Sequence, residues 1–217
     1  MILALALAAQ AATGAPSPAP VTAIDAERAF IADAHTIGQW VAFRKWSSED
    51  AVLFGPQPEN AHAALKDAPE PKVAIFWWPG QSFVSCDGNL AVNTGPWVRG
   101  GGKKVGFFTT VWRRKDGEWR WIYDGGGDLE APRAEGGDIK PVVASCASRP
   151  TQAAVPEPIE GLDPPFKTGS GTSVDSSLTW HYRVDAHGAR HFVAQLWDGS
   201  SWQTVIDDRV PAPPPQP

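Results

Sequence analysis

Apolar residues recur every three or four positions between Thr22 and Ser48, which is the spacing of an amphipathic helix. Gly38 interrupts this segment, so we expect the helix to break there. The pattern that follows indicates a short strand over residues 49–56 and then a short helix that ends at Pro69. These elements place helical structure at the start of the folded chain.

Alternation of apolar and other residues predicts strands from Gln81 onward. Residues 81–100 form a hairpin across Asp87–Gly88, and residues 103–128 form another across the two-residue turn Asp116–Gly117. Closing that second turn sets Trp112 opposite Trp121. Helices followed by a meander of at least four strands indicate an α+β fold, with the helices on one face of an antiparallel sheet.

The second hairpin is apolar on both faces, so we expect both faces to be covered. The period of two predicts one face of large rings, made of Phe108, Trp112, Trp119, Trp121 and Tyr123. The other face carries Phe107, Thr109, Val111, Ile122 and Asp124. Because this second face has the smaller residues, we expect it to meet the helices and a pocket. The ring face then lies outward, beneath the carboxyl-terminal strands or a second copy of the chain.

Composition along the chain predicts five segments. Residues 1–21 read as a signal peptide and spacer, and residues 22–128 as the helix-and-sheet domain. Residues 129–172, rich in proline and glycine, indicate an irregular connector. Residues 173–210 alternate as a β-meander packed on the sheet, and residues 211–217 form a proline-rich disordered tail.

The carboxyl-terminal meander partly repeats the earlier strands. Ser85, Asp87 and Leu90 recur as Ser173, Asp175 and Leu178, and Trp119 and Asp124 align with Trp202 and Asp207. This echo fits either an internal duplication or hairpins that reached the same turn chemistry independently.

The amino terminus and the cysteines both indicate export. Residues 2–9 form an apolar run that is too short to span a bilayer and is followed by small residues, as in a signal peptide that is cleaved near Ala11. No lysine or arginine precedes the run, so a cytoplasmic protein with an Ala/Pro-rich start is the alternative. In an exported chain, Cys86 and Cys146 can form a disulfide. We therefore expect a periplasmic or secreted protein.

Charge and motifs limit the partners. The net charge of −5 argues against nucleic acid, which requires a basic face. The run from Gly100 to Lys104 lacks the spacing of a phosphate-binding loop. His187 and His191 are four residues apart in a hairpin, where they do not share a face as zinc ligands on a helix do. We expect no metal, no cofactor and no integral membrane span.

Three stretches in order resemble a known family: the early helix with its following strand (residues 27–67), the Asp87–Gly88 hairpin, and the Asp116–Gly117 hairpin. Their order over about residues 24–126 is similar to the SnoaL-like proteins of the nuclear-transport-factor superfamily, and to the domain of unknown function 4440 group in particular. The resemblance implies a cone in which a curved antiparallel sheet wraps around helices and leaves a pocket at its open end. It also implies members that range from isomerases, dehydratases and cyclases to binding domains, often dimeric through the sheet.

Two carboxylates are candidates for the interior of such a pocket, namely Asp33 on the helix stripe and Asp124 at the end of the last cone strand. A carboxylate in an apolar pocket has a raised pKa and can act as a general acid or base. Trp40, Phe54 and Thr109 are the expected neighbours. Each carboxylate also has a structural interpretation: Asp33 pairs with a basic residue, and Asp124 bonds to the glycine turn. No complete catalytic set of a superfamily enzyme aligns onto the chain, so an enzymatic activity stays open.

Three functions therefore remain. The first is an exported, non-catalytic domain that binds a small apolar or aromatic molecule, as a monomer or a sheet-mediated homodimer, which an open cavity without a buried carboxylate would favour. The second is an isomerase, dehydratase or cyclase-type enzyme that uses a pocket carboxylate, which an open cavity with one buried carboxylate would favour. The third is an envelope assembly module without a ligand, which a fully packed cone would favour.

Overall fold

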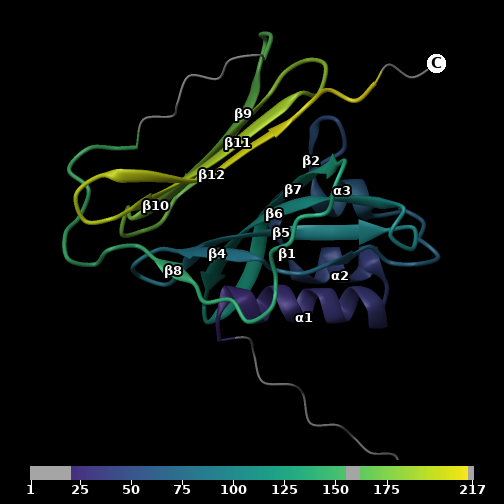
Figure 1. Ribbon diagram of the computed structural model, residues 1–217, viewed down its shortest axis with the longest axis horizontal. Helices are drawn as coiled ribbons and strands as arrows, with labels where there is room; N and C mark the ends of the chain where they lie inside the picture. Colours follow the sequence, from purple (N-terminus) through teal and green to yellow (C-terminus); the bar gives the residue numbers. More distant parts are fainter. Residues whose placement is uncertain (1–20, 155–161, 215–217) are drawn as a thin grey trace, which may run out of the picture.

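The computed structural model describes residues 21–154 and 162–214. The predicted signal peptide and spacer, apart from Val21, lie outside these residues. Figure 1 shows three stacked layers: the helices, a large sheet and a smaller sheet. Within the described part of the chain, no helix combines the length and the apolar character that a membrane span needs.

The helical layer matches the sequence pattern. Helix α1 covers Ala23–Thr36 and α2 covers Gln39–Trp46, so the break at Gly38 is confirmed. Thr22 and Asp25 form a capping box that satisfies backbone donors at the start of α1. Gly38 has φ 108°, a left-handed conformation that favours glycine. The short helix α3, Ala61–Leu65, follows after two strands.

The large sheet has eight strands in the order β2-β1-β7-β6-β5-β4-β8, with β3 paired to β5. Its long members are β5 (Leu90–Arg99), β6 (Lys104–Lys115) and β7 (Glu118–Leu129). The shorter ones are β1 (Ser47–Phe54), β2 (Pro58–Asn60), β3 (Phe76–Trp77), β4 (Gln81–Val84) and β8 (Val142–Val143). Asp116 and Gly117 have positive φ, and Trp112 pairs with Trp121, so the predicted turn and register are confirmed.

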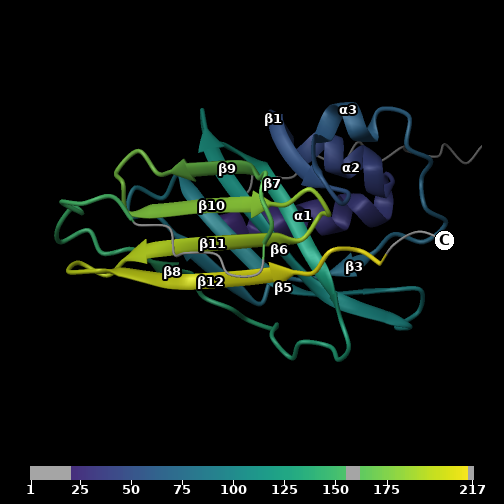
Figure 2. The ribbon, with the colours of Figure 1, turned by 90° about the horizontal axis from the view of Figure 1, so that it is seen from above.

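The second sheet has the order β12-β11-β10-β9 and lies on the face of the large sheet opposite the helices (Figures 1 and 2). Its strands are β9 (Lys167–Thr172), β10 (Leu178–Val184), β11 (Arg190–Trp197) and β12 (Trp202–Val210). Strand β9, together with β8, comes from the segment expected to be an irregular connector. Glycine and serine make up half of β9, so its sequence does not indicate a strand. It forms one because all of its residues pair with β10 at the edge of this sheet.

The two faces of the β6–β7 hairpin are the reverse of the expectation. The rings of Phe108, Trp112, Trp119 and Trp121 pack in the core that also contains the α1 residues Ala23, Ala26, Phe30 and Ala34. Volume explains the reversal, because the face of α1 is rich in alanine and large rings on the sheet fill the space that it leaves. The helices therefore cover the ring face, and the second sheet covers the face with Val111.

A β-bulge places Tyr123 and Asp124 on the opposite faces of the sheet from those predicted for them. The register slips between Val111 and Trp112, so that Trp112 pairs with Trp121 and Val111 pairs with Tyr123, which leaves Ile122 as the extra residue. Tyr123 consequently packs with residues of the second sheet, away from Trp121. Asp124 shifts to the helix side together with Thr110, its partner in the ladder.

The second sheet repeats the strands β4–β7 in both order and register. The pair Val84–Ala91 beside the first turn corresponds to Thr172–Thr179 in the second sheet. The bulge at Ile122 corresponds to a bulge at Val205, since Ala194 pairs with Ile206 and Gln195 with Thr204. Equal strand order, equal turns and an equally placed bulge identify the partial sequence echo as an internal structural repeat.

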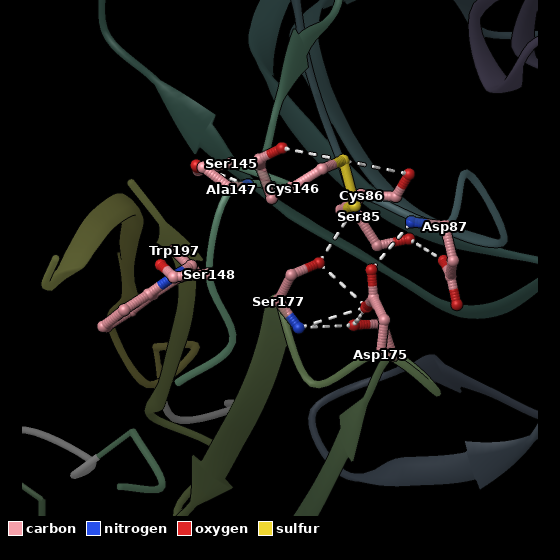
Figure 3. The surroundings of a disulfide bond; sticks show 12 residues. Ser85, Cys86, Asp87, Ser145, Cys146, Ala147, Ser148, Asp175, Ser177 and Trp197 are labelled. Atoms are coloured by element: carbon pink, nitrogen blue, oxygen red, sulfur yellow. Dashed lines mark hydrogen bonds between the residues drawn. A yellow bond between two sulfur atoms is a disulfide. The ribbon is translucent and has the colours of Figure 1, made fainter. Parts of the chain in front are cut away.

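Matching turns join the two sheets (Figure 3). Ser85 Oγ donates to Asp87 Oδ1 at 2.5 Å, and Ser173 Oγ donates to Asp175 Oδ1 at 2.6 Å in the equivalent turn. The Asp87 N–H then donates to Asp175 Oδ2 across the sheets at 2.7 Å. Beside this contact, Cys86 forms a disulfide with Cys146 (S–S 2.06 Å). The disulfide fixes the chain that leads away from β8 to the same corner.

Candidate functional site

A pocket of about 470 Å³ lies between the helices and the large sheet. Helix α2, strand β1, the segment 66–75 and the ends of β5, β6 and β7 supply its walls. Seven aromatic residues line it: Trp40, Phe43, Phe54, Trp77, Trp97, Phe107 and Phe108. Its volume is within the usual range for small-molecule sites, and its walls are mainly apolar as in such sites.

Asp124 supplies the carboxylate of the pocket, because the bulge before it turns its side chain to the helix side. Its Oδ2 accepts a hydrogen bond from Thr110 Oγ1 at 2.9 Å. Burial, and next the negative charge of Glu27, raise the pKa of Asp124 from 3.8 to about 7. The glycines that follow, residues 125–127, also line the pocket, and a Cβ at Gly126 would clash with the Phe107 carbonyl oxygen. The glycine run therefore permits close strand pairing beside the carboxylate.

Glu27 of α1 is a second buried carboxylate that the sequence reasoning missed. Its side chain is fully buried and accepts hydrogen bonds from Trp112 Nε1 at 2.7 Å, Trp77 Nε1 at 2.8 Å and Asn93 Nδ2 at 3.3 Å. Burial raises its pKa to about 7, against the opposing effect of these donors. The helix period contained the signal, because Glu27 is four residues after Ala23 and three before Phe30 on the buried face of α1.

The five predicted site residues divide into two groups. Trp40, Phe54 and Asp124 line the pocket. Asp33 does not, since its Oδ2 accepts bonds from Lys45 Nζ and Trp46 Nε1, both at 2.6 Å, at the side of the helices. Thr109 faces the second sheet, where its Oγ1 donates to Asp208 Oδ2 at 2.6 Å. Thr110 takes the place beside Asp124 that was expected for Thr109.

The segment 66–75 forms one wall of the pocket and is tied to α2. Glu70 accepts the backbone N–H groups of Trp40 and Val41 through its two carboxylate oxygens, each at 3.0 Å. These donors lie in the first turn of α2, where a helix has no internal acceptors and favours negative charge. Pro71 and Val73, next in the chain, line the pocket. Glu70 thus caps the helix and fixes the wall at once.

The rim of the pocket carries an exposed ion pair. Arg99 Nη2 lies 3.4 Å from Asp128 Oδ1, and both side chains line the pocket. The Arg99 guanidinium also lies over the Trp97 ring, at 5.1 Å from its centroid. Lys104 approaches the same aspartate at 4.0 Å. The two cations at the rim therefore share one carboxylate.

Metal ligands do not gather in the described ranges, where no group of three histidine, cysteine or carboxylate side chains could hold an ion. His191 bonds instead to Asp207 Oδ1 through Nε2, at 2.7 Å.

Helices enclosed by a sheet, with a pocket at the open end, define an α+β cone protein. No family model and no curated protein matches the chain. Similar solved structures include an NTF2-like protein of unknown function from Shewanella oneidensis MR-1, which is 18% identical with a TM-score of 0.38 and aligns over 47% of this chain and 96% of its own.

Two further similar structures are of the same kind. An NTF2-like protein of unknown function from Pseudomonas putida KT2440 is 16% identical, with a TM-score of 0.33 and coverage of 54% of this chain and 92% of its own. A protein of unknown function of the DUF3225 family from Pectobacterium atrosepticum SCRI1043 is 15% identical, with a TM-score of 0.36 and coverage of 48% and 87%.

Proposed function

We propose that the protein binds a small, mainly apolar or aromatic molecule in the cone pocket. The observation that carries this proposal is the cavity of about 470 Å³, which seven aromatic residues line; the carboxylate of Asp124 inside it favours the second candidate function below. Apolar walls with few polar anchors are the general composition of small-molecule sites. A fully packed cone, which would have favoured an assembly module, is not what the chain forms.

A neutral fluorescent probe tests the proposal. We expect N-phenyl-1-naphthylamine to bind saturably at one site with a rise in its fluorescence. Leu53→Trp places a large side chain in the pocket wall and should abolish the rise. Val174→Trp adds the same side chain at a position that is 92% exposed and should leave binding unchanged. Absence of saturable binding, or equal binding by Leu53→Trp, would contradict the proposal.

Proton transfer is the second candidate, favoured by the pKa of about 7 at Asp124. A general base works best when its pKa is near the working pH, and isomerases, dehydratases and cyclases all move protons. Stabilising the charge of an intermediate needs a further polar group. The pocket offers the rim pair and the amide NH2 of Gln39, whose Oε1 accepts the Ile75 N–H at 2.8 Å. Binding is the leading function because no complete catalytic set of a superfamily enzyme aligns onto the chain.

Deuterium exchange separates binding from proton transfer. The α-protons of 2-tetralone, a bicyclic ketone of suitable size, exchange slowly in D2O. If Asp124 acts as a base, the wild-type protein accelerates the loss of their NMR signals and Asp124→Asn does not. If the wild-type protein does not accelerate the exchange, proton transfer is excluded for this ketone and binding is the remaining function.

We further propose export to the periplasm or beyond, membership of the domain of unknown function 4440 group, and a monomeric state. The Cys86–Cys146 disulfide supports export because such bonds persist in oxidising compartments, and the order of the three matching stretches supports the group. Burial of the outer sheet face beneath β9–β12 supports a monomer, since a sheet-mediated homodimer would need that face. The intact mass of protein purified from its source tests whether the chain is exported and cleaved. Light scattering in solution tests whether it is a monomer.

A further inference from the structure

The pocket combines aromatic walls with a carboxylate that is only partly satisfied. Thr110 donates to Oδ2 of Asp124, and among the described residues no other side chain or backbone group donates to this carboxylate. One oxygen is therefore available to a ligand. Asp124 is half-buried among apolar walls and has a single hydroxyl donor, which disfavours its ionised form, so a cationic ligand would relieve that cost.

The charges around Asp124 also favour a cation. Glu27 is a second carboxyl group in the core behind the pocket, and where it is ionised its charge acts on Asp124 more strongly than that of Arg190 does. Arg190 is occupied elsewhere: its Nη2 donates to the Gly126 carbonyl at 2.6 Å, and its guanidinium lies over the Phe54 ring at 4.2 Å. No lysine lines the pocket, and at its rim Arg99 and Lys104 share the carboxylate of Asp128.

An anionic ligand fits this arrangement poorly. It would have to break the contact of Arg99 with Asp128 at the rim, and its apolar body would still bring negative charge toward Asp124. A cation gains from both components of the wall, since it pairs with the carboxylate and is attracted to ring faces. Of the seven rings around the pocket, those of Trp97 and Phe54 already carry Arg99 and Arg190, and the other five have no cation over them among the described residues.

We propose that the cone pocket binds a protonated amine that has an aromatic or apolar body, with its ammonium group paired to Asp124 and its body against the surrounding rings. The inference rests on the proposed binding function and names the class of ligand. The volume of about 470 Å³ accommodates an amine with a bicyclic ring system.

Three probes of one shape and different charge test the inference on the full chain. They are 2-naphthylmethylamine, 2-naphthylmethanol and 2-naphthoate, each titrated at pH 7 against bound N-phenyl-1-naphthylamine. We expect the amine to bind at least about tenfold more tightly than the alcohol, which corresponds to about 1.4 kcal/mol, and 2-naphthoate to bind most weakly. This ranking uses wild-type protein and needs no variant.

Variants then locate the preference. Asp124→Asn should bring the amine and the alcohol to similar affinities. Asp116→Asn makes the same substitution at the exposed tip of the same hairpin, where φ is 53° and asparagine is well tolerated, and it should retain the preference. Equal affinities in the wild type, or an amine preference that survives Asp124→Asn, would overturn the inference and leave the binding function intact. Failure of all three probes and of N-phenyl-1-naphthylamine would overturn the binding function itself.

Discussion

Replacing Glu27 by glutamine should flatten the dependence of stability on pH. The Glu27 carboxyl is fully buried, and burial raises its pKa from 4.5 to about 7. The folded protein therefore holds this proton more tightly than the unfolded chain does. Stability from this group is complete below about pH 4.5 and is lost as the pH rises through about 7.

The size of the effect follows from the pKa shift. One pKa unit corresponds to about 1.4 kcal/mol, so the free energy of unfolding should fall by about 3 kcal/mol across this window because of Glu27 alone. Glutamine cannot ionise and so removes this loss. It differs from the protonated acid at one atom, since the hydroxyl oxygen of the acid can still accept from an indole N–H, whereas the amide NH2 cannot, so the variant loses the bond from Trp77 or from Trp112. We therefore expect the variant to be less stable than the wild type near pH 4.5, by about 1–3 kcal/mol, and this difference to shrink as the pH rises.

Urea unfolding of the disulfide-bonded protein, followed by tryptophan fluorescence from pH 4.5 to 8.5, measures this difference. We expect the stability of Glu27→Gln relative to wild type to increase by about 3 kcal/mol over the range. Glu49→Gln removes a carboxylate from an exposed position of β1 and should follow the wild-type profile. Part of the remaining slope belongs to Asp124, whose pKa Glu27 also raises.

Parallel profiles for wild type and Glu27→Gln would refute the reasoning. They would mean that the three donors to Glu27 outweigh its burial, so that the carboxylate is ionised in the folded protein throughout the range. A variant that is several kcal/mol less stable at every pH would show that the bonds to Trp77 and Trp112 require both carboxylate oxygens.

Two further predictions concern the supports of the pocket and the sheets. The double variant Cys86→Ser, Cys146→Ser should have a free energy of unfolding that is lower by about 4 kcal/mol, because the disulfide closes a loop with a sequence separation of 60. Guanidinium unfolding measures this change. A loss below about 1 kcal/mol would show that the hydrogen-bonded turns hold this corner without the disulfide. Glu70→Ala should lower stability by on the order of 1 kcal/mol, because the α2 cap is lost, and should weaken N-phenyl-1-naphthylamine binding, because the wall with Pro71 and Val73 loosens. Lys72→Ala in the same exposed segment should change neither property. Equal melting temperatures and equal affinities for the two variants would contradict the capping role.

Patterns of local origin could be predicted from the sequence. The break at Gly38, the turn at Asp116–Gly117 and the pairing of Trp112 with Trp121 depend on residues close in the chain, where backbone preferences decide the outcome. The same holds for Trp40 and Phe54, which the pattern assigned to a helix and a strand that both border the pocket.

Features that depend on the packing of distant segments could not be predicted in this way. The period of two fails at Ile122, because a bulge adds one residue without a clear mark in the sequence. That single residue separates Tyr123 from Trp121. Which face meets the helices depended on the small residues of α1, and Asp33 found its partners only when α2 brought Lys45 and Trp46 beside it.

The repeat separates what the sheet supplies to the site from what the helices supply. In both meanders an aspartate follows the bulge by two residues, Asp124 after Ile122 and Asp207 after Val205. Asp124 lies in a pocket with aromatic walls, where burial raises its pKa. Asp207 is 40% exposed and bonds to His191. Burial acts to raise its pKa, but the hydrogen bonds from Arg209 and His191 together outweigh burial and hold the pKa below its usual value. Sheet geometry alone therefore does not make the site. Within the described residues, α1, α2 and the segment 66–75 have no counterpart beside β9–β12, and it is their enclosure of Asp124 that turns a repeated carboxylate into a candidate ligand anchor.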